Sequence, residues 1–570
     1  MSSRRDGTAT TTTLRVLHGI GVSAGTACGP VVIVRGAPGP DPSEPATTDP
    51  ALASRQIRAA MQAVAAALTE QARTAPAAAR PILEATAAMA ADRGLAKAVD
   101  QELATGSGRT RAVSDAVDRY STRLQSLGGY LAERVTDLQD VRDRLICQLR
   151  GLPAPGLPDL ATPGILVARD LAPADTATLT PQTVLGILTE AGGPTSHTAI
   201  LAAQLGIPAV VQVAGLADLE EGTVVGIDGS LGEVLLSPSD AEVTMLADRS
   251  RRRAATLAGP GGAGGTRDGH HVALLANIGT AADATRAAAC DVEGSGLFRT
   301  EFLFLDRATA PTLTEQTAAY TTVLRAFGDR PVVVRTLDAG ADKPLPFANL
   351  GTEANPALGR RGLRLSQLRE DLLATQLDAL AAAYRATAAD VRVMAPMIST
   401  VEEAEWFATR VRAAGLPAVG VMIETPAAAL RAEQVLAVVD FASIGTNDLA
   451  QYTMAADRLQ GGLAGLLSPW QPAVLQLVQA ACDGGRVTGK HIGICGEAAG
   501  DPLLALVLTG AGATSLSMAS SRVAAVRAAL RLHDLDTCRQ MAATAVAART
   551  ATDGRDAVLA MADPALADLL

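Results

Sequence analysis

The stretch that decides the fold runs from residue 418 to residue 449 and reads AVGVMIETPAAALRAEQVLAVVDFASIGTNDL. It contains two short apolar segments, and polar residues follow each of them: Glu424 after the first, Asn447 and Asp448 after the second. A short apolar run bounded in this way is typical of a strand buried on both faces. The stretch therefore predicts two parallel strands with acidic groups at their carboxyl ends.

The same pattern extends outward through the second half of the chain. The apolar segments are VALLANIG (272–279), GSGLFRTEFLF (294–304), VVVRTLD (332–338), VRVMAPMIS (391–399), AVGVMIET (418–425), FASIGTNDL (441–449), HIGICGE (491–497) and SLSMA (515–519). Segments with the apolar spacing of a helix, such as EEAEWFATRVRAAG, separate most of them. Eight strands alternating with helices predict a (β/α)8 barrel of the TIM type over residues 269–570, with a doubly wound open sheet as the alternative.

Polar residues fall repeatedly at the predicted carboxyl ends of these strands, where barrel enzymes place their reacting groups. They are Arg299, Glu301, Arg335, Asp338, Glu424, Asn447, Asp448, Cys495 and Glu497, and Arg361 and Arg458 lie in the loops after the third and sixth strands. Four convergent arginines indicate a small ligand with several negative charges. Glu424 and Asp448 among them predict a Mg²⁺ site, with a metal-free network of arginines and carboxylates as the alternative.

Cys495 admits two interpretations from its position. A free cysteine is most often an inert small core residue. A thiol at a strand end is also protonated at neutral pH and able to exchange its proton, so Cys495 is a candidate proton donor.

The first half of the chain combines segments with strand-like patterns and segments with helical patterns. Residues 14–40 and 151–238 carry short apolar strands separated by glycines, whereas residues 41–150 carry apolar residues at three- and four-residue spacing. We therefore expect one discontinuous α/β domain with an inserted helical domain. Residues 1–13 are expected to be a disordered tail, and residues 239–268 a linker helix followed by a flexible glycine-rich linker.

His197 is the candidate nucleophile of this half. It lies in GGPTSHTAI (192–200), which follows an apolar strand and opens a helical run. The unpaired N–H groups and the dipole of a helix start favour an anion, which suits a phosphorylated histidine. Taken alone, a histidine at a helix start is more often a cap or a core residue.

Composition excludes several classes of protein. The net charge of −10 and the lack of a basic stripe argue against nucleic-acid binding. The chain has no run of 18 or more apolar residues, which argues against a membrane span. Its six cysteines are scattered without CxxC pairs, which indicates a reducing cytoplasm.

Several of these segments together resemble enzyme I of the bacterial phosphoenolpyruvate-dependent sugar phosphotransferase system. The likeness covers about residues 14–540 and rests on these motifs: GGPTSHTAI, DLAPADTATL (170–179), GSGLFRTEFLF, VVVRTLDAGADKPLP (332–346), NPALGRRGLRL (355–365), GVMIETPAAAL (420–430), DFASIGTNDLAQYTMAADR (440–458) and GICGEAAGD (493–501). The helical insert resembles the docking domain of that family for the phosphocarrier HPr, notably in YLAERVTDLQDVRDRL (130–145).

The resemblance implies a specific role for each matched residue. His197 would be phosphorylated by phosphoenolpyruvate, with Thr176 as its hydrogen-bonding partner, and Cys495 would protonate the enolate to give pyruvate. The substrate would be held by Arg299, Arg335, Arg361, Asn447 and Arg458, and Mg²⁺ by Glu424 and Asp448. The phosphoryl group would pass to HPr, the phosphohistidine domain would swivel between the two sites, and the barrel would form a homodimer.

Four rivals remain beside this interpretation. Pyruvate phosphate dikinase and phosphoenolpyruvate synthase share the motifs but need an ATP-binding module, for which the chain has no space. A nitrogen-branch enzyme I carries a sensory domain that has no counterpart here. A regulatory scaffold of the same fold would not turn over. Two positions depart from the family pattern: Pro194, close to His197, and Arg360, next to Arg361.

Overall fold

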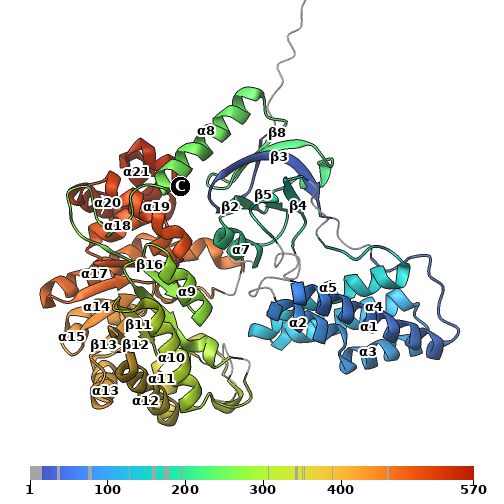
Figure 1. Cartoon of the computed structure of the whole chain (residues 1–570), viewed down its shortest axis with the longest axis horizontal. Helices are drawn as coiled ribbons and strands as arrows, with labels where there is room; N and C mark the ends of the chain where they lie inside the picture. The colour runs from blue at the N-terminus through green and yellow to red at the C-terminus, as the bar shows by residue number, and fades with distance from the viewer. Residues whose placement is uncertain are drawn as a thin grey trace, which may run out of the picture. The chain divides into compact units, whose positions relative to one another are not determined.

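The structure is a computed structural model of the 570-residue chain. It describes residues 16–34, 39–74, 80–127, 129–156, 162–171, 179–193, 197–305, 307–339, 345–348, 351, 353–387, 389–458 and 461–570. The chain divides into two compact units, Met1–Arg252 and Arg253–Leu570, which we describe separately (Figure 1). The expected tail over residues 1–13 lies outside the described residues.

One mixed sheet organises the first unit, in the strand order β1-β8-β7-β3-β4-β5-β6-β2. Its strands are β1 (Val16–His18), β2 (Ile20–Ser23), β3 (Thr26–Ile33), β4 (Gly164–Ala168), β5 (Val184–Thr189), β6 (Ala209–Val211), β7 (Val224–Asp228) and β8 (Glu233–Leu236). Strand β3 pairs in parallel with β4, with Val31 opposite Ile165. Because about 130 residues separate these neighbours, the α/β part is discontinuous, as the sequence predicts.

The described residues between β3 and β4 form five helices, drawn in blue to cyan in Figure 1. They are α1 (Pro50–Thr74), α2 (Arg80–Ala90), α3 (Arg93–Ala104), α4 (Arg109–Leu127) and α5 (Gly129–Arg150). Their apolar faces form a core of their own that includes Ile57, Leu68, Val113 and Leu145. A separate core is what an inserted helical domain requires.

The second unit is a closed barrel of eight parallel strands. The strands are β9 (Ala273–Ile278), β10 (Ser295–Arg299), β11 (Val332–Arg335), β12 (Val391–Ala395), β13 (Ala418–Ile423), β14 (Phe441–Ile444), β15 (His491–Ile494) and β16 (Ser515–Met518). Strand β16 pairs with β9, with Ser515 opposite Ala273, and this pairing closes the ring. The predicted (β/α)8 barrel is therefore confirmed, and the open-sheet alternative is wrong.

Helices surround this barrel (Figure 1). They are α9 (Ala281–Ala289), α10 (Leu313–Phe327), α11 (Leu363–Leu368), α12 (Glu370–Thr387), α13 (Val401–Ala413), α14 (Pro426–Leu430), α15 (Ala432–Leu436), α16 (Thr446–Met454), α17 (Pro472–Thr488), α18 (Pro502–Ala511), α19 (Val523–Leu532), α20 (Leu535–Ala547) and α21 (Ala551–Met561). Their buried faces and the outward faces of the strands form the largest core of the chain. No helix in the described part of the chain is long and apolar enough to cross a membrane.

The barrel interior is set by alternation along each strand, because residues two apart share a face. A small apolar cluster of Leu297, Val333, Met394, Met422, Phe441 and Cys495 is distinct from the core under the helices and marks the inner face. Two positions after Leu297, Val333 and Met422 come the charged residues Arg299, Arg335 and Glu424. Alternation therefore places these three side chains at the carboxyl end of the interior.

The glycine-rich segment after helix α8 (Asp240–Leu257), which we expect to be a flexible linker, makes several hydrogen bonds to the barrel unit. The Gly262 N–H donates to Asp291 Oδ2 at 2.6 Å, and the Gly264 N–H donates to Glu293 Oε1 at 2.8 Å. The Arg531 guanidinium donates to the carbonyl of Gly261 at 2.8 Å. Glycine allows the close approach that these backbone bonds need, and composition alone does not reveal them. The flexibility of the segment stays a prediction.

Candidate active site at the carboxyl end of the barrel

The strand ends of the barrel bring charged residues together in the order that the sequence predicts. Arg299 and Arg335 are the last residues of β10 and β11 and lie opposite each other in the strand register. Glu424 directly follows β13, and Asp448 lies in the first turn of α16, just after β14. Cys495 directly follows β15.

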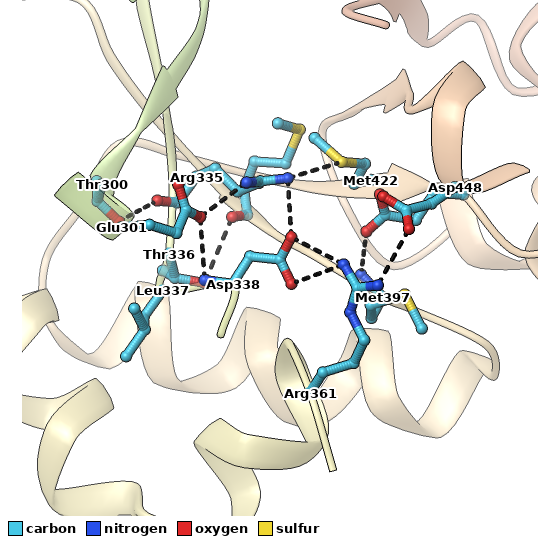
Figure 2. Close-up of polar contacts among 12 residues, drawn as sticks. Thr300, Glu301, Arg335, Thr336, Leu337, Asp338, Arg361, Met397, Met422 and Asp448 are labelled. Carbon is cyan, nitrogen blue, oxygen red and sulfur yellow. Dashed lines mark hydrogen bonds and ion pairs between the residues drawn. The ribbon is translucent and has the colours of Figure 1, made fainter. Parts of the chain in front are cut away.

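Glu301 and Asp338 hold Arg335 from two sides (Figure 2). Arg335 Nη2 donates to Glu301 Oε1 at 2.7 Å, and Arg335 Nη1 lies 3.0 Å from Asp338 Oδ2. Glu301 Oε1 also accepts the backbone N–H of Asp338 at 3.1 Å. All three side chains are buried, at 10% exposure or less, so the pairing offsets the cost of removing their charges from water.

Arg361 extends this arrangement toward the second acidic group, as Figure 2 shows. Its Nη2 lies 3.3 Å from Asp338 Oδ2, and its Nη1 lies 3.1 Å from Asp448 Oδ1. Arg458 Nη1 reaches the other oxygen of Asp448 at 3.4 Å. Arginines and carboxylates thus alternate across the barrel mouth, in one connected network of Glu301, Arg335, Asp338, Arg361, Asp448 and Arg458.

Two arginine groups keep donor capacity for a ligand. The buried Nε of Arg335 has no hydrogen-bond partner among the described residues. Arg299 is half-buried, and it makes no hydrogen bond or ion pair with any other described residue. An oxyanion bound between these strand ends would supply acceptors for both.

Glu424 is the most buried acidic group of the site, at 1% exposure. Burial raises the pKa of its carboxyl well above the ordinary value, and the charge of Asp448 raises it further, while Arg335 opposes the shift. Two buried carboxylates that destabilise each other's charge are a suitable donor pair for a hard divalent cation. The described residues contain no group of three or more metal-ligating side chains, so substrate oxygens or water would complete the coordination.

A strained backbone orients Glu424. The Met397 N–H donates to Glu424 Oε1 at 2.6 Å, and Met397 adopts a φ of 59°, in the left-handed region that non-glycine residues rarely occupy. Gly362, next to Arg361, lies against this turn, since a Cβ on Gly362 would fall 2.7 Å from Met397 Cβ. Strain held in place by packing is common at functional sites.

Asn447 joins two strand ends rather than contacting the arginines. Its Oδ1 accepts the backbone N–H of Glu497 at 3.3 Å, which links the start of α16 to the turn after β15. Its side-chain amide donors are suited to a substrate oxygen on the same side.

Cys495 is buried at 2% exposure, with its thiol 3.6 Å from the carbonyl oxygen of Ile444. Burial raises the pKa of the thiol to about 11, although a hydrogen bond from Ser443 and the charge of Arg335 lower it in part. The group therefore remains a thiol at neutral pH, as a proton donor must.

Arg360, one of the two departures from the family pattern, pairs with Glu353. Its Nε donates to Glu353 Oε1 at 2.7 Å, and its backbone N–H donates to the same carboxylate. This pair closes the loop that carries Arg361. Arg360 thus fixes the loop without competing for the ligands of Arg361.

The candidate nucleophile of the first unit is described in part. His197 is the first residue of helix α7 (His197–Leu205), which confirms the predicted helix start. The structure does not describe the His197 side chain, and Thr176 and Pro194 lie outside the described residues.

Sequence reasoning missed several contributors to the site. Glu301 and Asp338 stood out as polar strand ends, but the sequence did not show that Glu301 pairs with Arg335. It also did not show that Asp338 bridges Arg335 and Arg361. Met397 and Tyr452 gave no signal, although Tyr452 Oη lies 3.4 Å from Arg361 Nη1. A left-handed φ at a methionine cannot be read from the residue type.

Three family models match consecutive parts of the chain. Residues 18–134 match the PEP-utilising enzyme N-terminal domain, residues 160–232 the mobile domain and residues 263–535 the PEP-binding domain. A phosphoenolpyruvate-protein phosphotransferase of Streptomyces coelicolor is 50% identical over 548 residues, which cover 96% of this chain and 99% of that protein. One from Haloferax volcanii is 41% identical over 80% of this chain and 83% of its own length. A multiphosphoryl transfer protein of Xanthomonas campestris is 42% identical over 83% of this chain and 58% of its own length.

The chain belongs to the phosphoenolpyruvate-protein phosphotransferase family. It is thus an enzyme of the first step of the phosphotransferase system, and the resemblance found in the sequence is confirmed. The dikinase, synthase and scaffold alternatives are disfavoured, because the likeness to this family runs over nearly the full length of both chains.

Proposed function

We propose that the barrel binds phosphoenolpyruvate with Mg²⁺, that His197 takes the phosphoryl group, and that HPr receives it from His197. The observation that carries the proposal is the buried alternation of arginines and carboxylates at the carboxyl end of the barrel. Four arginines (Arg299, Arg335, Arg361 and Arg458) face four carboxylates (Glu301, Asp338, Glu424 and Asp448), so their formal charges cancel. A substrate with several negative charges then needs an added cation, which supports a metal beside Glu424 and Asp448.

Each residue has a distinct part in the proposed reaction. Arg299 and the free Nε edge of Arg335 bind phosphate and carboxylate oxygens, with Asn447 assisting. Arg361 and Arg458 hold Asp448 while contributing their remaining donors to the substrate. A bound Mg²⁺, held by Glu424 and Asp448, supplies charge neutralisation on the phosphoryl oxygens.

The chemical step needs a nucleophile on one side of phosphorus and an acid on the other side of the substrate. His197 attacks phosphorus, and the N–H groups at the start of α7 favour the phosphorylated imidazole. Cys495, held as a thiol by its burial, gives its proton to the enolate carbon, and pyruvate leaves. Thr176 is the proposed hydrogen-bonding partner of His197.

The second half-reaction requires His197 to reach a separate protein. The proposed docking site for HPr is the helical insert, whose own core supports its function as a module. The α/β domain would swivel between the barrel and the carrier. We further propose a homodimer formed through the barrel and a cytoplasmic location, which suits the six cysteines that the structure leaves unpaired.

A labelling experiment tests the proposal. The full chain is incubated with Mg²⁺ and phosphoenolpyruvate labelled in its phosphoryl group, with and without HPr, and a His197→Ala variant is treated in parallel. We expect acid-labile label on the wild type that moves to HPr, and none on the variant. Label on His197→Ala would overturn the assignment of the nucleophile, and label that never moves to HPr would overturn the assignment of the acceptor.

A further inference from the structure

The barrel interior is hollow beneath Cys495. Barrels of this kind usually fill the interior with layers of bulky branched side chains. Here the lower inner positions include Gly296, Gly493, Ser443, Ser515 and Ser517, which line a cavity of about 50 Å³. This volume is large enough to hold water.

Two of these small residues are required for the cavity to exist. A Cβ on Gly493 would lie 2.7 Å from Ser515 Oγ, and one on Gly296 would lie 2.7 Å from Ser517 Oγ. Larger side chains at either position would displace the serines. The serine hydroxyls give water in the cavity the polar partners that it needs.

Ser443 connects this cavity to the thiol of Cys495. Cys495 does not line the cavity, whereas Ser443 does. Ser443 pairs with Gly493 in the strand register, two residues before Cys495, and directly precedes Ile444, whose carbonyl oxygen lies 3.6 Å from the thiol. Ser443 therefore lies between the sulfur and the hollow interior.

His491 lies at the other end of the cavity. It shares the inner face of β15 with Gly493 and Cys495, because the three residues alternate along the strand. It is exposed, and it also lines a surface groove of about 750 Å³ between α17, α18 and α20. Arg392 lines the cavity as well, but it is paired with Asp390 at 2.7 Å.

A buried proton donor must recover its proton after every turnover. Cys495 is 2% exposed, so bulk water does not reach it directly. The thiol lies 3.6 Å from the carbonyl oxygen of Ile444, and the neighbouring Ser443 carries the hydroxyl between this strand end and the cavity. A carbonyl oxygen has no proton to give, so Ser443 is the partner that can return one.

We propose that Cys495 is reprotonated from the amino-terminal end of the barrel, through Ser443 and water in the serine-lined cavity, with His491 at its opening. The proposal rests on the role of Cys495 as proton donor to the enolate. After pyruvate forms, the thiolate sulfur takes the Ser443 hydroxyl proton while Ser443 Oγ takes a proton from a cavity water. The deficit passes to His491, which recovers a proton from solvent at the opening, so one solvent proton is consumed for each pyruvate and no redox partner is needed.

The relay predicts that only the first turnover is independent of Ser443. In Ser443→Ala, rapid-quench measurement with excess phosphoenolpyruvate and HPr should give one pyruvate per site at the wild-type rate. Later turnovers should slow by roughly tenfold or more, still less than the roughly 10²–10⁴-fold expected for loss of a direct general acid. Ser443→Thr, which keeps a hydroxyl, should restore the steady-state rate. Ser295→Ala, a buried strand serine that does not line the cavity, is the matched control.

Two results would overturn the relay: a wild-type steady-state rate in Ser443→Ala, or an equal slowing of its first and later turnovers, which indicates a structural role. Should Ser443→Ala fail to fold, His491→Leu at the exposed opening decides the matter by the same two rates. Loss of the proposed donor role is distinguishable, because Cys495→Ser would then form pyruvate normally in the first turnover.

Discussion

The two units of the chain contribute to the proposed reaction in opposite ways. The barrel places eight charged side chains from several strand ends in one buried centre, where each arginine is tied to a carboxylate or keeps free donors. The first unit offers one imidazole at the start of α7. In the proposed reaction, substrate recognition is therefore distributed over many groups, whereas transport of the phosphoryl group depends on one. Losing a barrel residue should weaken binding or chemistry by degrees, and losing His197 should stop transfer altogether.

The largest graded effect is expected for the thiol. Cys495→Ser should lower the rate of pyruvate formation by roughly 10²–10⁴-fold, because a serine hydroxyl is a weaker acid in the same buried position. Binding of phosphoenolpyruvate should change little. Stopped-flow detection of pyruvate measures the rate, and Cys482→Ser, a second buried cysteine remote from the barrel mouth, is the control. Pyruvate formation at the wild-type rate would remove Cys495 from the mechanism.

Replacement of the bridging arginine tests the distributed character of the barrel site. Arg361→Lys should lower kcat/KM by about 10²-fold, because an ammonium group cannot span Asp338 and Asp448 as two guanidinium nitrogens do. Arg539→Lys, which alters an exposed pair with Asp536, should leave the kinetics unchanged. A wild-type kcat/KM in the Arg361→Lys enzyme would show that the bridge is dispensable.

The metal assignment predicts a smaller and more specific change. Glu424→Gln should raise the Mg²⁺ concentration for half-maximal activity by at least roughly tenfold, since a neutral amide is a poorer ligand. Titration of activity against Mg²⁺ measures this, with the exposed Glu433→Gln as the control. An unaltered titration curve would favour the metal-free network of arginines and carboxylates.

The smallest effect is expected at the loop that carries Arg361. Glu353→Gln weakens the partner of Arg360, whose side chain is 43% exposed, so the cost should stay near that of a surface pair. We expect KM for phosphoenolpyruvate to rise by no more than about fivefold, with kcat unchanged. A large fall in kcat would mean that this pair reaches the reacting groups.

Much of the fold could be predicted because it follows from local patterns. Each barrel strand is a short apolar run, and alternation along it places Arg299, Arg335 and Glu424 on the inner face without further information. The discontinuous sheet was predictable for the same reason, since short apolar segments typical of strands resume after the helical insert.

The remaining features depend on contacts between distant residues. Asp338 bridges two arginines only because β11 and the loop of Arg361 meet in space. Met397 donates its N–H to Glu424 from a left-handed backbone conformation, which its residue type does not predict. The glycine-rich segment was predicted as flexible, yet Asp291 and Glu293 hold it through backbone N–H groups. Composition does not reveal such partners.

Calorimetric titration of the His197→Ala protein with phosphoenolpyruvate, with and without Mg²⁺, tests the division between recognition and transfer most directly. We expect one saturable, Mg²⁺-dependent site per chain, because in the proposed reaction the barrel alone recognises the substrate. Absence of saturable binding in a folded His197→Ala protein would contradict it, since recognition would then require the first unit as well.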